Sequence, residues 1–186
     1  MKNLKRILQS ILIIVLIGLV FRGSVYRKVI TYKSIGERVN YSATNKNLIK
    51  YIEENTINAK DPKIEKIIDM GLSATSRLLR FTASKNHIEP NKLINTKTAN
   101  CIGYATFFSA NCNYLLKKYA LDNNWIAKPH KGQLYLFGIN IHKYFKSAFF
   151  KDHDFVIIEN KITGEILAVD PSINDYLYID YVTIKN

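Results

Sequence analysis

The pattern of apolar and polar positions along the chain changes twice. Residues 7–21 form a nearly unbroken apolar run, interrupted by Gln9, Ser10 and Gly18. From residue 45 onward, apolar residues recur every three or four positions, which predicts amphipathic helices. Beyond residue 124, short β-branched or aromatic runs alternate with turn residues, which predicts strands. Helices followed by antiparallel strands are typical of an α+β fold.

The predicted helices begin or end at recognisable signals. Asn45 precedes the first, and Asp61-Pro62 offers an N-cap and a first-turn proline for the second. The helices are expected at 45–55, 61–84 and 101–123. The strands are expected at 125–127, 134–139, 155–158, 166–169 and 176–179. The helix that begins at Cys101 should pack on the antiparallel sheet.

The N-terminal apolar run resembles a membrane or export segment. Lys2, Lys5 and Arg6 precede it, as in the basic region of a signal sequence. At about 15 residues it is shorter than the ~20 residues typical of a spanning helix. We therefore predict a signal anchor at 1–22, with a cleaved signal peptide as the alternative. A juxtamembrane connector at 23–44 and one domain at 45–186 follow.

Composition narrows the choice of partners. The chain has 186 residues, 47% of them hydrophobic, and a net charge of +12. Such a charge permits attraction to anionic lipid, wall polymer or nucleic acid. The lysines are scattered and no nucleic-acid motif is present, so no nucleic-acid partner is expected. No His or Cys pair shows zinc-ligand spacing, so neither a metal nor a cofactor is predicted.

Two cysteines lie on the predicted helix 101–123, and their positions differ. Cys112 falls in an apolar stripe with Ala105, Phe108 and Leu115, where a cysteine behaves as a small hydrophobe. Cys101 lies in the first turn, where unpaired N–H groups and the helix dipole favour a reactive thiolate. At 1.5 Å per residue the two are about 16 Å apart, too far for a disulfide.

A predicted hairpin brings a histidine and a carboxylate together. The strands 155–158 and 166–169 are joined by a run of turn formers, 159–164. A turn centred between Lys161 and Ile162 sets His153 directly opposite Asp170, within reach of a hydrogen bond. A carboxylate that orients an imidazole, beside a thiol, is the arrangement of a catalytic triad. Cys101, His153 and Asp170 are therefore the predicted catalytic residues.

Three segments together resemble the core motifs of the transglutaminase-like superfamily: NCIGYATFFSANCNYLL, HDFVIIEN and LAVDPS. The resemblance covers roughly residues 95–175. It implies a papain-like α+β core with Cys101 as nucleophile, His153 as general base and acid, and Asp170 as the orienting carboxylate. The superfamily often has Gly, Ala and Trp where Ala99, Asp154 and Phe155 stand here. The Cys101 motif also resembles that of NlpC/P60 peptidases, which Asp170-Pro171 fits less well.

The leading hypothesis is a membrane-anchored or exported cysteine enzyme that acts on an amide or peptide carbonyl, by hydrolysis or acyl transfer. Its partners would be a protein or peptide substrate and, through the N-terminal segment, a membrane. The body would lie outside a bacterial-type inner membrane, or be secreted if the segment is cleaved. The alternative is a catalytically silent binding module on the same fold, with 135–150 as its contact segment.

Overall fold

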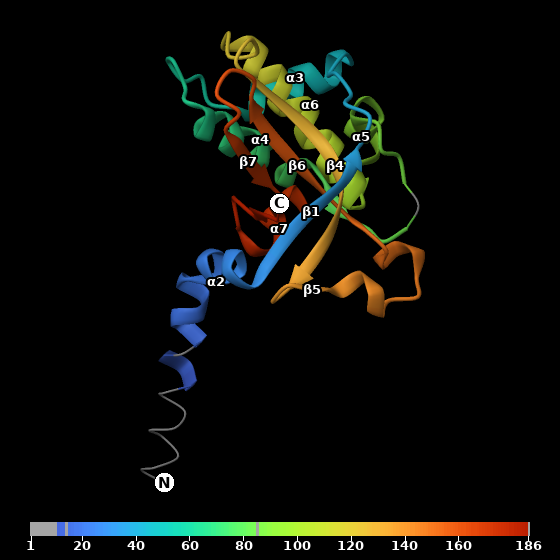
Figure 1. Cartoon of the computed structure of the whole chain (residues 1–186). Helices are drawn as coiled ribbons and strands as arrows, with labels where there is room; N and C mark the ends of the chain where they lie inside the picture. The colour runs from blue at the N-terminus through green and yellow to red at the C-terminus, as the bar shows by residue number, and fades with distance from the viewer. Residues whose placement is uncertain (1–10, 14, 85, 186) are drawn as a thin grey trace.

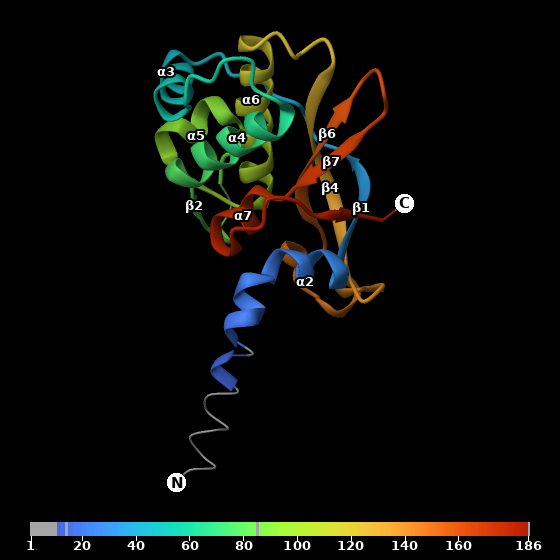
Figure 2. The ribbon, with the colours of Figure 1, turned by 90° about the vertical axis from the view of Figure 1, so that its left-hand side faces the viewer.

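A layer of helices packs against one face of a mixed but mainly antiparallel sheet, as Figures 1 and 2 show. The computed structural model describes residues 11–13, 15–84 and 86–185. The predicted α+β class is thus confirmed. The strands, in their order across the sheet, are β7 (Ile166–Val169), β6 (His153–Asn160), β4 (Trp125–Leu136), β1 (Ile30–Glu37) and β8 (Thr183–Ile184).

The remaining elements surround this sheet. The short strand β5 (Ile139–Asn140) pairs with β4, and β2 (Arg80–Phe81) pairs with β3 (Thr98–Ala99) apart from it. The α-helices are α2 (Arg22–Val29), α3 (Lys46–Asn55), α4 (Ile64–Leu78), α5 (Pro90–Thr96), α6 (Cys101–Lys118) and α7 (Pro171–Leu177). Two 3₁₀ turns, η1 (Ile141–Tyr144) and η2 (Ala148–Phe150), follow β5.

Helix α6 lies at the centre of the molecule and is buried on nearly every side. The predicted apolar stripe is present, with Phe108 and Cys112 fully buried. The opposite side is buried as well, including Phe107 and Leu116. The helix contacts both α4 and the strands β4 and β6, which explains why apolar residues extend beyond a single stripe. Its first residue is therefore held in place from two sides.

Helix α4 is shorter than the sequence pattern predicted. It begins at Ile64 because Asp61 adopts a left-handed conformation, with φ of 48°, which is incompatible with the N-cap position. It ends at Leu78 because Arg80 and Phe81 form backbone hydrogen-bonded pairs with Thr98 and Ala99. Both boundaries are set by contacts that a local pattern does not contain.

Two predicted strand assignments need correction. The runs 125–127 and 134–139 are largely parts of one long strand, β4, because its polar middle is paired on both sides by β1 and β6. The run 176–179 is not a strand. It overlaps the end of α7, which begins at Pro171 with Asp170 as its N-cap.

The predicted connector 23–44 is also part of the fold. Its middle forms β1, which pairs with β4 and β8, and Tyr32 on this strand is fully buried. The domain therefore begins before residue 45. The sequence pattern missed this strand because Lys33, Ser34 and Gly36 interrupt its apolar positions.

The segment before α2 projects away from the body (Figures 1 and 2). Residues 11–13 and 15–20 are helical, and their apolar side chains are about half exposed or more. Within the part of the chain that the structure describes, no helix has both the length and the apolar character needed to cross a membrane. The basic residues Lys2, Lys5 and Arg6 lie outside the described residues.

We predict that Gly132→Ala destabilises the fold. A Cβ at this position would lie 2.6 Å from Phe155 Cε1 and 3.0 Å from the carbonyl oxygen of His153. Relieving this overlap would move the strand that carries His153, and overpacking of this kind typically costs about 1–3 kcal/mol. Chemical denaturation would measure the loss of unfolding free energy. Gly18→Ala is the control, since nothing lies within 4 Å of its Cβ position; equal stability of the two variants would contradict the prediction.

Candidate active site

Cys101 is the first residue of α6, as predicted. Asn100 is the N-cap, and its side-chain oxygen accepts a hydrogen bond from Gly103 N at 3.2 Å. The first intrahelical hydrogen bond runs from Tyr104 N to the carbonyl of Asn100. The N–H groups of Cys101 and Ile102 precede this bond, so they belong to the positive end of the helix dipole. The sulfur therefore lies beside a local concentration of positive charge.

The carboxylate of Asp170 is fully buried and surrounded by donors. Its Oδ1 accepts hydrogen bonds from Ser172 N, Ser172 Oγ and Ile173 N at 2.7–3.1 Å. Its Oδ2 accepts from Tyr32 Oη at 2.8 Å and lies 2.5 Å from His153 Nε2. Five partners compensate for the loss of water around a buried carboxylate. They also fix its orientation.

His153 is the first residue of β6 and connects the carboxylate to the thiol. Its Nε2 is engaged by Asp170, which leaves Nδ1 as the ring nitrogen available to Cys101. Burial alone would lower the pKa of His153. The charge of Asp170, its hydrogen bond, and a hydrogen bond with Cys101 outweigh burial and hold that pKa well above its ordinary value. The structure thus brings the three predicted residues together.

The predicted register of the hairpin is wrong by two residues. Val156 pairs with Val169 and Glu159 with Ile166, so continuation of this register sets Asp170 opposite Phe155 rather than His153. The turn is centred one residue further along than predicted. Asn160 accepts hydrogen bonds from Ile162 N and Thr163 N, and Gly164 takes a left-handed φ of 73°. His153 still contacts Asp170, because positions two residues apart share a face and are diagonal neighbours.

Two tyrosines extend the network and were missed at the sequence level. Tyr32 Oη donates to Asp170, and the hydroxyls of Tyr32 and Tyr26 lie 2.6 Å apart. The ring of Tyr32 also lies 6.2 Å from that of His153, edge to face. Burial, and then the charge of Asp170, raise the pKa of Tyr32 well above its ordinary value, so it remains a proton donor to the carboxylate. These residues come from α2 and β1, the segment predicted to be a connector.

A second buried carboxylate, Asp154, does not belong to the triad. It accepts hydrogen bonds from Arg38 Nε and Nη2 at 2.9 and 3.0 Å, and its side chain is fully buried. Asp154 is therefore held by Arg38 and does not face solvent. The hydrogen bond to Asp154 is the main cause of the raised pKa of Arg38.

Cys112 is buried and unpaired, as predicted. The chain contains two cysteines, both described, and they form no disulfide. Burial raises the pKa of Cys112 to about 12, so its thiol remains protonated at neutral pH. This cysteine is a core side chain.

The thiol of the candidate site is largely covered. Cys101 is 7% exposed, and the nearby side chains of Arg38, Asp152 and His153 are 19–29% exposed. Gly103 does not open an approach to the sulfur. A Cβ there would lie 2.7 Å from Ala99 Cβ, so the glycine allows close packing of α6 against β3.

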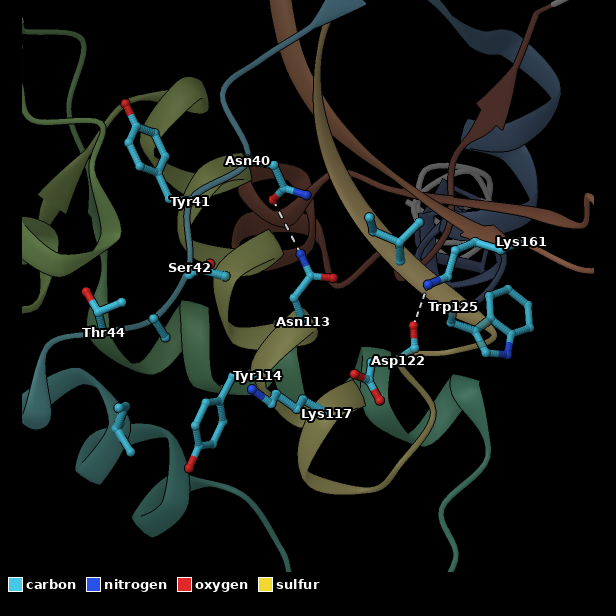
Figure 3. A pocket seen from close by; sticks show the side chains of 14 residues that line it. Asn40, Tyr41, Ser42, Thr44, Asn113, Tyr114, Lys117, Asp122, Trp125 and Lys161 are labelled. Atoms are coloured by element: carbon cyan, nitrogen blue, oxygen red, sulfur yellow. Dashed lines mark hydrogen bonds between the residues drawn. The ribbon is translucent and has the colours of Figure 1, made fainter.

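A pocket of about 650 Å³ lies away from the triad, between residues 40–44, the outer side of α6 and the start of β4 (Figure 3). Asn113 binds both the N–H and the carbonyl of Ala127, and its amide also donates to Asn40. Lys161 donates to the carbonyl of Asp122. These polar groups already join the elements that line the pocket, so they form a structural junction.

The other histidines have separate roles. His130 Nδ1 lies 2.8 Å from Ser34 Oγ, and His142 Nδ1 lies 2.6 Å from the carbonyl oxygen of Phe150. His87 is exposed. Among the described residues, no three histidine, cysteine or acidic side chains are grouped as metal ligands would be.

Comparison with protein-family models, with curated proteins and with solved structures finds no match to this chain. A functional assignment therefore depends on the chemistry of the residues that the fold brings together.

We predict that iodoacetamide modifies Cys101 in the folded protein and leaves Cys112 unmodified. Cys101 adjoins a helix N-terminus and the imidazole of His153, a setting in which thiols react with electrophiles, whereas the thiol of Cys112 is fully buried. Peptide mass mapping after brief labelling near neutral pH would measure both sites. Denaturant should make Cys112 reactive as well. Equal labelling of both cysteines in the folded state would contradict the prediction.

We also predict that Asp170→Asn lowers the pKa of His153. The substitution removes the carboxylate that raises this pKa and leaves the burial that lowers it. An asparagine oxygen can still accept the two backbone hydrogen bonds that begin α7. Titration of the histidine ring protons by NMR would measure the change. In the control Asp154→Asn, the pKa of His153 should move much less, because Arg38 holds that carboxylate.

The same pair should give the stability of the protein a defined pH dependence. The pKa of His153 is raised in the folded protein. Its contribution to the unfolding free energy is therefore fully present below pH 6.5, the ordinary pKa of histidine, and is lost as the pH rises through the folded-state pKa. The pKa of Asp170 is lowered, because His153 and the hydrogen bonds outweigh burial. Its contribution is present above 3.8 and is lost as the pH falls. The stability difference between wild type and Asp170→Asn should therefore be greatest between pH 3.8 and 6.5.

Proposed function

We propose that the protein is a transglutaminase-like cysteine enzyme that acts on an amide or peptide carbonyl through Cys101, His153 and Asp170. The observation that carries the proposal is the contact chain from a helix N-terminal thiol, through one imidazole, to a buried carboxylate with five hydrogen-bond partners. A histidine–aspartate pair that only stabilises the fold does not require a thiol beside the imidazole. A nucleophilic site requires one.

The proposed reaction begins with transfer of the Cys101 proton to Nδ1 of His153. The thiolate attacks the carbonyl carbon, and the carbonyl oxygen becomes an oxyanion. The N–H groups of Cys101 and Ile102 at the start of α6 are suited to stabilise this charge. The protonated His153 then donates to the departing nitrogen as the carbon–nitrogen bond breaks, which leaves a thioester on Cys101.

Release of the acyl group repeats these roles. His153 removes a proton from water or from a second amine, which attacks the thioester carbonyl. The carbon–sulfur bond breaks and the thiolate is regenerated. Throughout, Asp170 keeps Nε2 as the proton-bearing nitrogen, so Nδ1 remains available to the sulfur and the substrate.

The proposal includes a papain-like core and an extracytoplasmic position. Helix α6 packed on the antiparallel strands β4 and β6 is the arrangement expected of such a core. The exposed apolar helical residues 11–13 and 15–20 are suited to membrane anchoring through the N-terminal segment. Its basic flank, which includes Arg22, Arg27 and Lys28, is suited to the lipid–water boundary.

The second candidate is a silent binding module, and the burial of Cys101 favours it. A residue that is 7% exposed offers little surface to a substrate. The two candidates differ in one property: an enzyme requires a sulfur that reacts with electrophiles in the folded state, and a binding module does not.

Activity measurements on triad variants test the proposal. We expect Cys101→Ala and His153→Ala each to abolish activity, a loss of ~10⁶-fold, because the members of such triads act as one unit. Asp170→Ala should cost less, about 10⁴-fold in activity. Amine incorporation into a glutamine-containing peptide, run beside a peptide-cleavage screen, would measure the activity. Wild-type protein that is inactive in both assays and unreactive at Cys101 would favour the binding module.

Tyr32→Phe is a finer variant of the same test. It removes the hydroxyl that binds the Asp170 carboxylate and the hydroxyl of Tyr26, and it keeps the buried ring. A hydrogen bond to a charged group contributes about 1.5–3 kcal/mol, so a tenfold or greater loss of kcat is expected. The control Tyr51→Phe removes a half-buried hydroxyl that donates to the carbonyl of Ala74, away from the triad. Equal effects of the two substitutions would assign Tyr32 a general structural role.

A further inference from the structure

The segment 137–151, which we call the aromatic excursion, leaves the sheet after β4 and returns at β6. It contains five aromatic residues of the Phe and Tyr types and three lysines, and it contains no acidic residue. Many of its large side chains are exposed although they are apolar. The most exposed are Phe137 and Tyr144, both 75%, followed by Ile139, Phe150 and Phe145, at 56%, 46% and 41%.

The tip of the β4–β5 hairpin holds a bulky residue in a strained backbone conformation. Leu136 pairs with Ile139, so Phe137 and Gly138 form a two-residue turn, and both have positive φ, of 48° and 81°. Such turns favour Asn-Gly, because a non-glycine residue with a bulky side chain costs ~1–2 kcal/mol in the left-handed region. Phe137 accepts this strain while its ring remains in solvent. A binding partner would account for the aromatic residue at this position.

The position of the excursion indicates the partner. Phe137 N donates to the carbonyl of Val29 at 2.8 Å, so the hairpin tip adjoins the last turn of α2. Figures 1 and 2 both show β5 and the following turns at the end of the body from which the N-terminal helix projects. The apolar helical residues 11–13 and 15–20 and the aromatic excursion therefore leave the same end of the molecule.

The composition of the excursion fits a lipid surface better than a protein partner. Aromatic rings bury their apolar part at the headgroup level, and lysines extend toward anionic headgroups. Lys143, Lys146 and Lys151 alternate with the rings, and all three are exposed. The ring of Phe150 packs against those of Phe145 and Phe149, with centroids 5.0 and 4.9 Å away, and the three form an apolar unit between these charges.

We propose that the aromatic excursion is an interfacial contact that lays this end of the body on an anionic lipid membrane. The contact rests on the membrane position proposed for the N-terminal segment. It is independent of the proposed chemistry. His153 pairs with Gly132, four residues before the end of β4, so the triad lies in the half of the body that faces the lipid surface. A substrate would then be reached close to the membrane.

A single tryptophan placed in the full-length chain tests the contact. Trp125 is the only tryptophan and is replaced by Phe, after which Phe137→Trp supplies the reporter. Ile162→Trp is the matched control. Ile162 is 73% exposed in the β6–β7 turn, at the opposite end of the sheet, as the pairing of Trp125 with Asn160 indicates. Leu16→Trp reports separately on the N-terminal helix.

Each variant is reconstituted in phosphatidylcholine vesicles with phosphatidylglycerol and with lipid brominated in the acyl chains. We expect blue-shifted emission and several-fold stronger quenching for Phe137→Trp than for Ile162→Trp. Omission of phosphatidylglycerol, or replacement of Lys143, Lys146 and Lys151 by Gln, should reduce the quenching at Phe137→Trp and leave it unchanged at Leu16→Trp.

Two results would overturn the proposal. If Leu16→Trp is quenched and Phe137→Trp is not, the N-terminal helix enters the bilayer without the excursion. If Phe137→Trp is blue-shifted but unquenched, the excursion is covered by protein, such as a second copy of the chain. If Leu16→Trp is also unquenched, the proposed membrane position fails as well. None of these results bears on the reactivity of Cys101, so the proposed enzymatic function is tested separately.

Discussion

The buried carboxylate of Asp170 is the constraint on which the candidate site depends. A fully buried anion is tolerated only when its hydrogen-bonding capacity is used, and here donors come from three separate parts of the chain. The backbone of α7 fixes one oxygen, while Tyr32 and His153 share the other. Because every donor is needed, the carboxylate fixes the start of α7, the position of β1 and the ring of His153 simultaneously.

This dependence makes the N-terminal part of the fold a component of the site. Helix α2 supplies Tyr26 to the hydroxyl of Tyr32, and its Arg22 donates to the carbonyl of Leu177 at the far end of α7. The short helix that begins at Asp170 is thus held at both ends by α2 and β1. A chain that lacked this segment would lose contacts to the carboxylate as well as one strand.

The central position of α6 has a similar effect on Cys101. The helix is packed between the sheet and α4, so Cys101 cannot shift along the helix axis without disturbing the core. Gly103 and Gly132 permit the close approaches that this arrangement requires, at Ala99 and Phe155 respectively. The same close packing leaves the sulfur largely covered.

The sequence by itself determined the features that depend on neighbouring residues. These were the α+β class, the start of α6 at Cys101 with its Asn100 cap, the burial of Cys112 and the hairpin that carries His153 and Asp170. Features that depend on distant residues were decided by the tertiary structure. The exact turn shifted the hairpin register by two residues, and the two-residue period of a strand therefore kept both side chains on one face. Strand β1, and with it Tyr32, was not predictable because its pairing partners lie about 100 residues or more away, and no local pattern records such pairing. For the same reason, the partner of Asp154 could be identified only after folding had placed Arg38 beside it.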